Sequence, residues 1–267
     1  VVLVIWFLVL LLHKRIGSVK KEVRQEKARM ARDMEKRELE KELRLKADFT
    51  AMLVHELRNP LTAVMGYSEL LMKNPKRANV HNIGNVVFKS TGRMLGLIND
   101  MLDISKFEAG KMVVYKKSTL LNGVVDEDLQ LITPLLEEKE IDVDLDLEEL
   151  DEIPMDREKI TQVIQNFFSN AMKFTPVGGV IRVITRAVEI DDRVFHELSV
   201  IDEGPGVPPE SVDHLFDKYA QLNSDVKAKG TGLGLAVSRL IIEAHDGHIG
   251  YKPVTENKGS IFYFQLP

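Results

Sequence analysis

The sequence predicts two structural classes in one chain, an all-α helical hairpin followed by a layered α/β domain. Three observations support this prediction. Residues 19–46 are rich in helix-forming side chains and contain no glycine or proline. Apolar residues recur at helical spacing through residues 47–111. From about residue 112, short runs typical of β-strands alternate with helical patterns.

Length, composition and charge exclude several classes of protein. The 267 residues are enough for two modest domains with separate cores. The absence of cysteine excludes disulfide frameworks and thiolate metal sites. Residues 13–46 carry thirteen Lys or Arg against seven Asp or Glu, yet the whole chain has a net charge of -5, so its remaining body is acidic. An acidic body is a poor surface for nucleic acid, and we expect no such partner.

The first twelve residues, Val1 to Leu12, are entirely apolar and are followed at once by His-Lys-Arg. Twelve residues are too few to cross a bilayer, which needs about 20. Positive charge gathers where a membrane helix emerges into the cytoplasm. We interpret residues 1–12 as the end of a transmembrane helix, with more chain upstream. This interpretation predicts a protein of the inner (cytoplasmic) membrane, with residues 13–267 in the cytoplasm. The core of a signal peptide and a buried soluble helix are the alternatives.

Residues 13–46 form the next predicted segment, a signalling helix that links the membrane to the hairpin. Its apolar positions approximate a heptad stripe with a slip in phase, and charged pairs such as Glu40 and Arg44 lie four residues apart. The pattern predicts a marginal two-stranded coiled coil. A solvated single helix is the alternative.

Residues 47–111 show two apolar helical stripes joined by a turn at 73–76. A lone helical hairpin buries little of either stripe. Pairing with a second copy into a dimeric four-helix bundle would cover both. We therefore predict a homodimer formed through residues 19–111.

Residues 112–267 form the predicted α/β domain, which is expected to contain a mixed sheet. Strands are expected at residues 112–115, 141–147, 180–188, 195–201, 248–251 and 260–265. Helices are expected at residues 119–138, 157–174 and 232–245.

Two glycine-containing segments of this domain indicate a ligand. The run at 230–234 leads straight into a helical pattern, where bare backbone amides can bind phosphate, although a simple helix-entry turn would look the same. Upstream, Asp202 follows a strand-like run and precedes Gly204 and Gly206. A carboxylate at the end of a strand can accept hydrogen bonds from a flat ring such as adenine. An acidic turn is the alternative.

Asn166, Asn170 and Lys173 share one face of the helix predicted at 157–174, because they lie at positions i, i+4 and i+7. Asparagine is unfavourable inside helices, so two on one stripe indicate an external ligand. An amide oxygen suits the hard cation Mg²⁺, and an ammonium suits phosphate. The stripe predicts a Mg²⁺-bound polyphosphate, with an exposed polar face as the alternative.

Taken together, these segments resemble the ATP-binding domain of sensor histidine kinases from two-component systems. The N, G1, F and G2 boxes of that family are matched in order and spacing by Asn166…Asn170…Lys173, Asp202-x-Gly204-x-Gly206, His214-Leu215-Phe216 and Gly230-Thr231-Gly232-Leu233-Gly234-Leu235. The resemblance implies the Bergerat (GHKL) fold, an α/β sandwich that binds ATP between helices and a mobile lid. The lid would comprise about residues 207–229.

The resemblance also assigns roles to site residues. It implies that Asp202 holds the adenine amino group and that Asn170 ligates Mg²⁺. It implies that Asn166 and Lys173 contact the phosphates. The other ATP-binding positions that it implies are Phe174, Gly204, Gly206, Phe216, Lys218, Gly230, Thr231, Gly232, Leu233 and Gly234. The lid offers lysines and no arginine, so a phosphate contact there would lack a planar guanidinium.

The first hairpin helix contains the segment His55-Glu56-Leu57-Arg58-Asn59-Pro60. A lone histidine on a helix is usually structural or exposed. With Phe49 six residues upstream, however, this segment resembles the H box of the dimerisation and phosphotransfer domain of the same family. The resemblance implies that His55 accepts a phosphoryl group through Nε2. Glu56 would accept a hydrogen bond from Nδ1–H as orienting group or general base, and Asn59 would position a water for phosphatase activity.

The implied function is autophosphorylation of His55 by ATP and Mg²⁺, followed by transfer to an aspartate of a separate response regulator. Phosphatase activity toward that regulator is also implied. ATP-hydrolysing relatives of this fold, such as gyrase, chaperone and mismatch-repair ATPases, place a water-activating Glu four residues before the metal-binding Asn, where this chain has Asn166. A non-catalytic dimerisation module would have degenerate boxes, whereas every expected residue type is present here.

Overall fold

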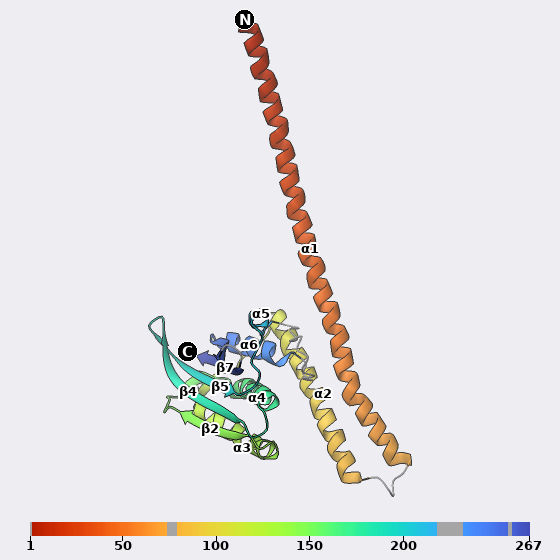
Figure 1. Cartoon of the computed structure of the whole chain (residues 1–267), viewed down its shortest axis with the longest axis vertical. Coiled ribbons are helices and arrows are strands. Elements are labelled where there is room, and N and C mark those ends of the chain that lie inside the picture. Colours follow the sequence, from red (N-terminus) through yellow and green to blue (C-terminus); the bar gives the residue numbers. More distant parts are fainter. Residues whose placement is uncertain (1, 74–78, 218–231, 256–257) are drawn as a thin grey trace. The chain divides into compact units, whose positions relative to one another are not determined.

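The computed structural model describes residues 2–73, 79–217, 232–255 and 258–267 (Figure 1). The chain divides into two compact units, Val1–His55 and Glu56–Pro267. The division falls within helix α1 (Val2–Lys73), so this one helix contributes to both units.

The described part of the first unit is entirely helical, which confirms the helix expected at residues 19–46. Met30, Met34, Leu39 and Leu43 each expose between 56% and 64% of their surface. A single helix has no core in which to bury them, so the coiled coil stays a prediction that needs a second copy. Within the described residues, no helix contains an apolar stretch long enough to span a bilayer.

The second unit begins with the predicted helical hairpin, formed by the last part of α1 and by α2 (Val80–Glu108). α2 begins at Asn79, whose Oδ1 accepts a hydrogen bond from the Asn82 N–H at 3.0 Å. After α2, the chain turns at Gly110, which has a φ of 63°. Met65 and Phe88 expose 65% and 79% of their surface, so the hairpin leaves large apolar side chains in solvent.

A five-stranded mixed sheet forms the rest of the framework, in the order β2-β4-β5-β7-β6. Its strands are β2 (Asp142–Leu147), β4 (Val180–Ile190), β5 (Arg193–Asp202), β6 (His248–Thr255) and β7 (Lys258–Leu266). Only β2 and β4 are parallel, and the other neighbours are antiparallel. All five strands coincide with runs that the sequence predicted.

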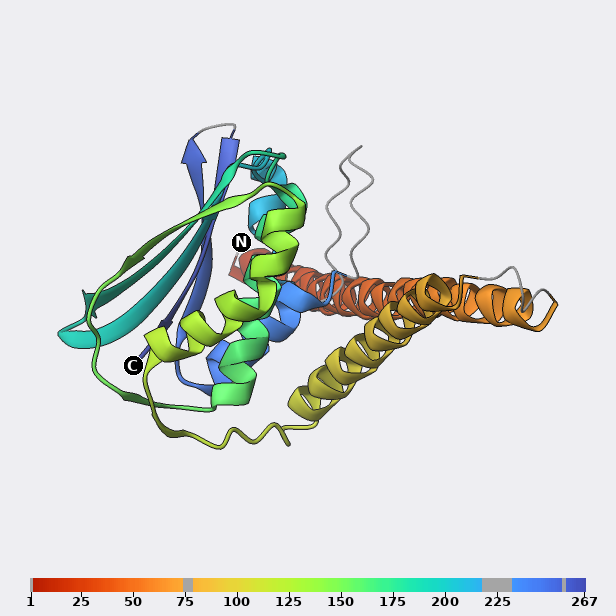
Figure 2. The same ribbon diagram turned by 90° about the horizontal axis from the view of Figure 1, so that it is seen from below.

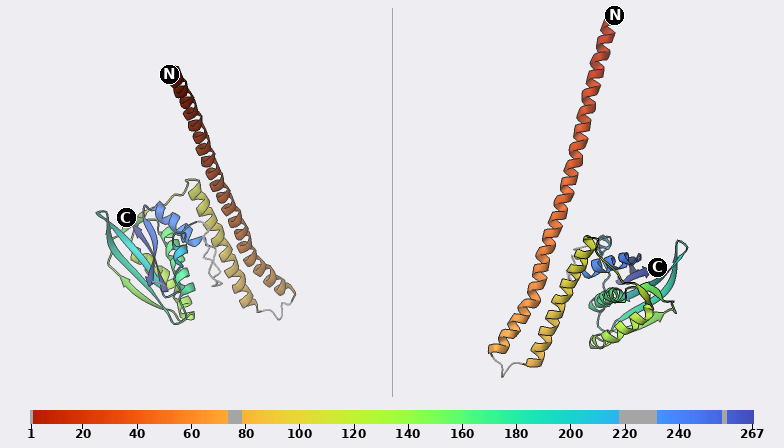
Figure 3. Two further views of the ribbon diagram at one scale, coloured as in Figure 1. Left: turned by 45° about the horizontal axis from the view of Figure 1, so that its top comes forward. Right: turned by 180° about the vertical axis from the view of Figure 1, so that it is seen from behind.

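Three helices cover one face of this sheet, as Figures 2 and 3 show from three further directions. They are α3 (Leu121–Glu138), α4 (Arg157–Phe174) and α6 (Gly234–Ala244). The core lies between the two layers, where Phe167 of α4 is fully buried with its ring centroid 5.7 Å from that of Phe262 and 6.1 Å from that of Phe264. The α/β sandwich that the resemblance implied is therefore present.

The predicted strand at 112–115 is wrong. Residues 111–116 belong to no sheet, and the backbone N–H of Tyr115 donates to Asp156 Oδ2 at 2.8 Å instead of to a neighbouring strand. Pairing begins two residues later, where β1 (Lys117–Thr119) joins β3 (Ile153–Met155) in a two-stranded antiparallel sheet. Neither β3 nor the short helix α5 (Pro209–Val212) was predicted from the sequence.

Candidate nucleotide-binding site

Helix α4 carries the asparagine stripe, and a buried polar cap fixes where it begins. Asp156 accepts a hydrogen bond from the Lys159 N–H at 3.3 Å through its side chain. Its own backbone N–H donates to Nε2 of His245, just beyond α6, at 2.9 Å. Burial lowers the pKa of His245, which keeps the imidazole neutral and able to accept that bond. The cap thus joins the start of α4 to the end of α6.

Asn166 lies in the middle of α4, where the stripe begins, and connects α4 to α6. Its Nδ2 donates to Ser238 Oγ at 3.0 Å. A Cβ on Gly234, the first residue of α6, would lie 2.2 Å from Asn166 Oδ1, so any other residue there would displace the Asn166 amide. Gly232 has a φ of 67°, which also favours glycine. The glycine run and the asparagine stripe therefore meet at the start of α6.

Asn170 and Lys173 continue the stripe toward the end of α4. Asn170 is half-buried, whereas Lys173 is exposed and places its Nζ 4.7 Å from the ring centroid of Phe174. Desolvation lowers the pKa of Lys173, and the positive charge of Arg93 lowers it further. Asn170 supplies an amide and Lys173 an ammonium on the same face of α4, and a polyphosphate can bind to both groups.

Asp202 ends strand β5 and is 2% exposed. Its Oδ1 accepts a hydrogen bond from the Gly204 N–H at 2.8 Å. Burial raises the pKa of Asp202 to about 6, and hydrogen bonds from Gly204 and Ser260 oppose that rise. These bonds favour the charged form, and the burial of Asp202 shields this acceptor from bulk water.

The loop after Asp202 approaches the end of α4. A Cβ on Gly204 would lie 2.6 Å from Asp202 Oδ1 and 2.9 Å from Phe174 Cβ, so a bare backbone is required there. Gly206 has a φ of 76°. The Glu203 carboxylate accepts a hydrogen bond from the Val180 N–H of β4 at 3.0 Å. The segment that begins at Asp202 and the end of the asparagine stripe thus meet at Phe174.

Seven of the predicted site residues fall into two groups. Asn166 lies against Gly234, next to Gly232 and Leu233, at the start of α6, and Asp202, Gly204 and Phe174 meet at the end of α4. Phe216 lines a pocket together with Arg239, Glu243 and His248. Lys218, Gly230 and Thr231 lie outside the described residues, as does most of the expected lid.

The H-box residues lie on α1. His55 and Asn59 are exposed, while Glu56 is half-buried. The Glu56 Oε2 forms an ion pair with Arg93 of α2 at 3.0 Å. Arg93 was not among the predicted site residues, because an arginine on an amphipathic helix carries no distinguishing pattern in sequence.

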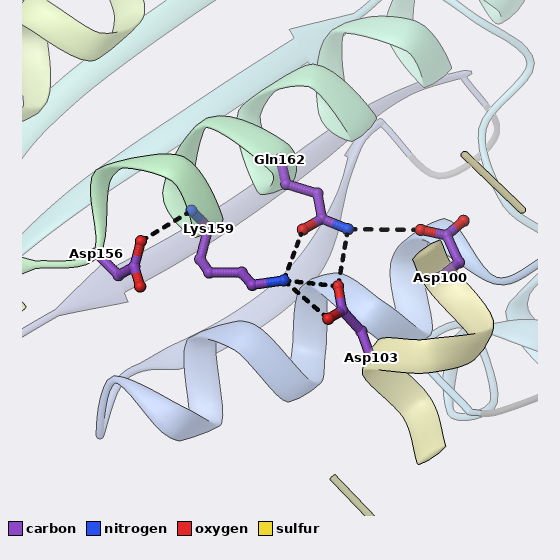
Figure 4. Close-up of polar contacts among 5 residues, drawn as sticks. All are labelled: Asp100, Asp103, Asp156, Lys159 and Gln162. Carbon is purple, nitrogen blue, oxygen red and sulfur yellow. Dashed lines mark hydrogen bonds and ion pairs between the residues drawn. The ribbon is translucent and has the colours of Figure 1, made fainter. Parts of the chain in front are cut away.

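A second polar cluster, which was not predicted from the sequence, joins α2 to α4 (Figure 4). Lys159 Nζ donates to both carboxylate oxygens of Asp103 at 2.8 and 2.7 Å. Gln162 Nε2 donates to Asp103 at 3.3 Å and to Asp100 at 3.5 Å. Burial raises the pKa of Asp100 to about 6, and the neighbouring Asp103 charge adds to the rise. Lys159 and Gln162 lie on the face of α4 that carries Asn166, so helical spacing alone could have indicated them.

The donor set fits ATP and Mg²⁺. Among the described residues there is no cluster of three or more His, Cys, Asp or Glu side chains that could hold a metal. The Asn170 amide oxygen is a suitable protein ligand for a Mg²⁺ ion whose other ligands would be phosphate oxygens and water, a usual arrangement for this ion. The buried acceptor Asp202 beside bare backbone at Gly204 fits a flat ring with an amino group.

Two family models match this sequence. The model described as "Histidine kinase-, DNA gyrase B-, and HSP90-like ATPase" matches residues 155–267. The model described as "His Kinase A (phospho-acceptor) domain" matches residues 45–110. The first match contains the candidate nucleotide site, and the second contains His55 and both helices of the hairpin.

Curated proteins with similar sequences are signalling kinases and a related protein. The chain is 29% identical over 238 residues to signal transduction histidine-protein kinase BarA of Escherichia coli (strain K12), which covers 88% of this chain and 26% of BarA. It is 35% identical over 244 residues to the non-motile and phage-resistance protein of Caulobacter vibrioides, covering 88% of this chain and 28% of that protein. The chain thus spans about a quarter of the length of these relatives.

Solved structures with similar folds are also histidine kinases. Full-length ShkA in complex with AMPPNP superposes with a TM-score of 0.61 at 27% identity, covering 81% of this chain and 45% of ShkA. Histidine kinase ThkA in complex with the response regulator protein TrrA gives a TM-score of 0.59 at 25% identity, covering 82% of this chain and 61% of that one.

Proposed function

The chain belongs to the sensor histidine kinase family, and we propose that it uses ATP to phosphorylate His55 and then passes the phosphoryl group to an aspartate of a separate response regulator. The observation that carries the proposal is the meeting of the asparagine stripe with Gly234 and of Asp202 with Phe174. These contacts occur in a chain that also has a His-Glu-Leu-Arg-Asn-Pro helix.

ATP would lie along α4, with its adenine at one end and its phosphates beside the asparagine stripe. The buried Asp202 carboxylate would accept a hydrogen bond from the adenine amino group. Asn166, Asn170 and Lys173 would contact the phosphates. Mg²⁺, when bound with ATP, would offset negative charge on the phosphates. The likeness to ShkA with bound AMPPNP supports nucleotide binding here.

In the proposed reaction, neutral His55 attacks the γ-phosphorus through the lone pair of Nε2. A nitrogen–phosphorus bond forms while the bond from the γ-phosphorus to its bridging oxygen breaks, and ADP leaves with that oxygen. Glu56 accepts a hydrogen bond from Nδ1–H, which fixes the tautomer and stabilises the positive charge that develops on the ring. Lys173 offsets charge on the leaving diphosphate.

The phosphohistidine would then react with a receiver aspartate of a separate protein. The structure of ThkA with its response regulator supports a partner of this class. Asn59 lies one helical turn beyond His55 and would orient a water that dephosphorylates the regulator. We also infer a homodimer through residues 19–111, since the hairpin leaves apolar side chains such as Phe88 exposed. Residues 1–12 would join this assembly to the inner membrane.

The test is incubation of the chain with γ-labelled ATP and Mg²⁺. His55→Gln and Asn170→Asp should abolish acid-labile, base-stable labelling, because they remove the acceptor and the metal-binding amide. His81→Gln, an exposed histidine on α2, is the matched control and should label normally. Label that survives His55→Gln would place the acceptor elsewhere. Release of inorganic phosphate with no labelled protein would indicate an ATP hydrolase instead.

A further inference from the structure

Arg93 of α2 holds the acid that follows His55 in the chain. Its guanidinium lies 3.0 Å from Glu56 Oε2, and the Glu56 side chain is 15% exposed while that of Arg93 is 45% exposed. In this arrangement the carboxylate that the proposed reaction needs beside the His55 ring is engaged by a cation on another helix. Arg93 still reaches solvent, so its guanidinium has room to make other contacts.

The polar cluster between α2 and α4 fixes the direction in which these helices pass each other (Figure 4). Lys159 near the start of α4 binds Asp103 near the end of α2. Gln162, one turn further along α4, reaches back to Asp100, one turn earlier on α2. At this crossing, the later residue of α4 therefore lies beside the earlier residue of α2.

Helical geometry extends this register from the cluster to the phosphate-binding end of α4. Arg93 and Asp100 lie seven residues apart, about two turns, and so share one face of α2. On α4, Lys159, Gln162 and Lys173 fall within one stripe for the same reason. The order of residues at the crossing places Arg93 on the side that faces the Asn170 and Lys173 end of α4. The effect of the Arg93 charge on the pKa of Lys173 agrees with this placement.

Gly96 lies on the side of α2 that also carries Asp100 and Asp103, and a Cβ there would meet nothing within 4 Å. Arg93 and Lys173 are two cations close enough for the charge of Arg93 to lower the pKa of Lys173. Like charges repel, so an anion between them would lower the energy of both.

We propose that Arg93 is a phosphate-binding residue which α2 contributes to the nucleotide site, and that its guanidinium exchanges the Glu56 carboxylate for the γ-phosphate when ATP is bound. This inference rests on the proposed function. The exchange is favourable because a planar guanidinium binds phosphate oxygens in pairs and the triphosphate carries more charge than one carboxylate. Its consequence is that ATP binding frees Glu56 for its neighbour His55.

The experiment compares Arg93→Gln and Arg93→Lys with the matched control Lys106→Gln, an exposed cation on the opposite face of α2. Competition against a fluorescent nucleotide measures ATP and ADP affinity, and γ-labelled ATP measures the labelling rate of His55. Arg93→Gln should weaken ATP binding while leaving ADP binding unchanged, since ADP has no γ-phosphate. It should also slow labelling by roughly 10- to 100-fold. Arg93→Lys should restore part of both effects, and Lys106→Gln should change neither.

Two outcomes would overturn the inference. Labelling at the parent rate in Arg93→Gln would mean that Arg93 takes no part in the reaction. Slower labelling with an unchanged ratio of ATP to ADP affinity would mean that Arg93 acts only through Glu56. Failure of the proposed function looks different, because the parent chain itself would then bind ATP without labelling His55.

Discussion

The hairpin and the α/β domain differ in how far they bury their large apolar side chains. In the α/β domain, helix α4 packs Phe167 and Phe168 against the sheet, and each of these residues exposes at most 1% of its surface. In the hairpin, Phe88 and Met65 expose most of their surface. This difference indicates that the α/β domain completes its core within one chain, whereas the hairpin requires another surface to cover its apolar stripes.

The glycines of the two regions differ in the same way. In the α/β domain, a Cβ on Gly204 or Gly234 would come within 3 Å of site atoms, so these glycines permit contacts that no other residue allows. In the hairpin, a Cβ on Gly66 or Gly84 would meet nothing within 4 Å. Close packing thus accompanies the nucleotide site, and open surface accompanies the predicted dimer contact.

The largest expected effect is on the free energy of unfolding, and it distinguishes the core of the α/β domain from the exposed apolar side chains of the hairpin. Phe167→Ala should lower the free energy of unfolding of the α/β domain by about 3–5 kcal/mol, because it leaves a cavity among Phe262, Phe264 and α4. Phe88→Ala should leave that domain's unfolding unchanged and weaken self-association. Thermal unfolding followed by circular dichroism would measure stability, and sedimentation would measure self-association. An α/β domain that loses as much stability from Phe88→Ala would contradict the comparison.

The next effect concerns the glycines. Gly204→Ala should weaken ATP binding by roughly 10- to 100-fold, since its Cβ would displace Asp202 Oδ1 or the Phe174 backbone. The control Gly66→Ala should leave ATP binding intact and stabilise α1 by about 0.5–1 kcal/mol, because alanine is the better helix former. Titration of both variants with ATP measures the two affinities. Equal losses of ATP affinity would show that the Gly204 contact is unimportant.

A smaller effect distinguishes the two aspartates of α2 that face α4. Asp103→Asn should cost about 1.5–3 kcal/mol at pH 7, since it removes a buried charge that accepts two hydrogen bonds from Lys159. Asp100→Asn should instead stabilise by about 1 kcal/mol at pH 7.

The reason lies in the raised pKa of Asp100, about 6, compared with an ordinary value of 3.8. The fold disfavours its charged form, so stability is lost as the pH rises from 4 through 6, and a neutral amide avoids that loss. At pH 4 the benefit of Asp100→Asn should vanish. Melting temperatures at both pH values test this, and a gain that persists at pH 4 would exclude the electrostatic cause.

The smallest effect is the pH dependence of nucleotide binding. Since burial raises the pKa of Asp202 to about 6, protonation should weaken ATP binding as the pH falls from 7 to 5, by up to about tenfold. Asp202→Asn should bind ATP more weakly at pH 7 and lack this part of the pH dependence. The phosphates of ATP titrate in both proteins, so the ratio of the two affinities isolates Asp202. A constant ratio from pH 5 to pH 7 would contradict the assignment.

Much of the fold and site could be predicted from local pattern. Helix 157–174 was predicted with the bounds that α4 has, because the helical spacing of its apolar residues is a local signal. The strand at 112–115 was wrong because the Tyr115 N–H donates to Asp156, a contact 41 residues away in sequence. Phe216 matched a family box, and the structure places it in a pocket that Arg239 also lines.

The sequence by itself determined the two structural classes, the amide and ammonium stripe of α4, the carboxylate that ends β5, and the histidine segment on α1. Each of these is a property of neighbouring residues, which periodicity and spacing reveal. Only the tertiary structure decided that Gly234 touches Asn166, that Asp103 binds Lys159, and that Arg93 holds Glu56. Those contacts join residues 37 or more positions apart, and their geometry depends on how helices pack, which no local pattern encodes.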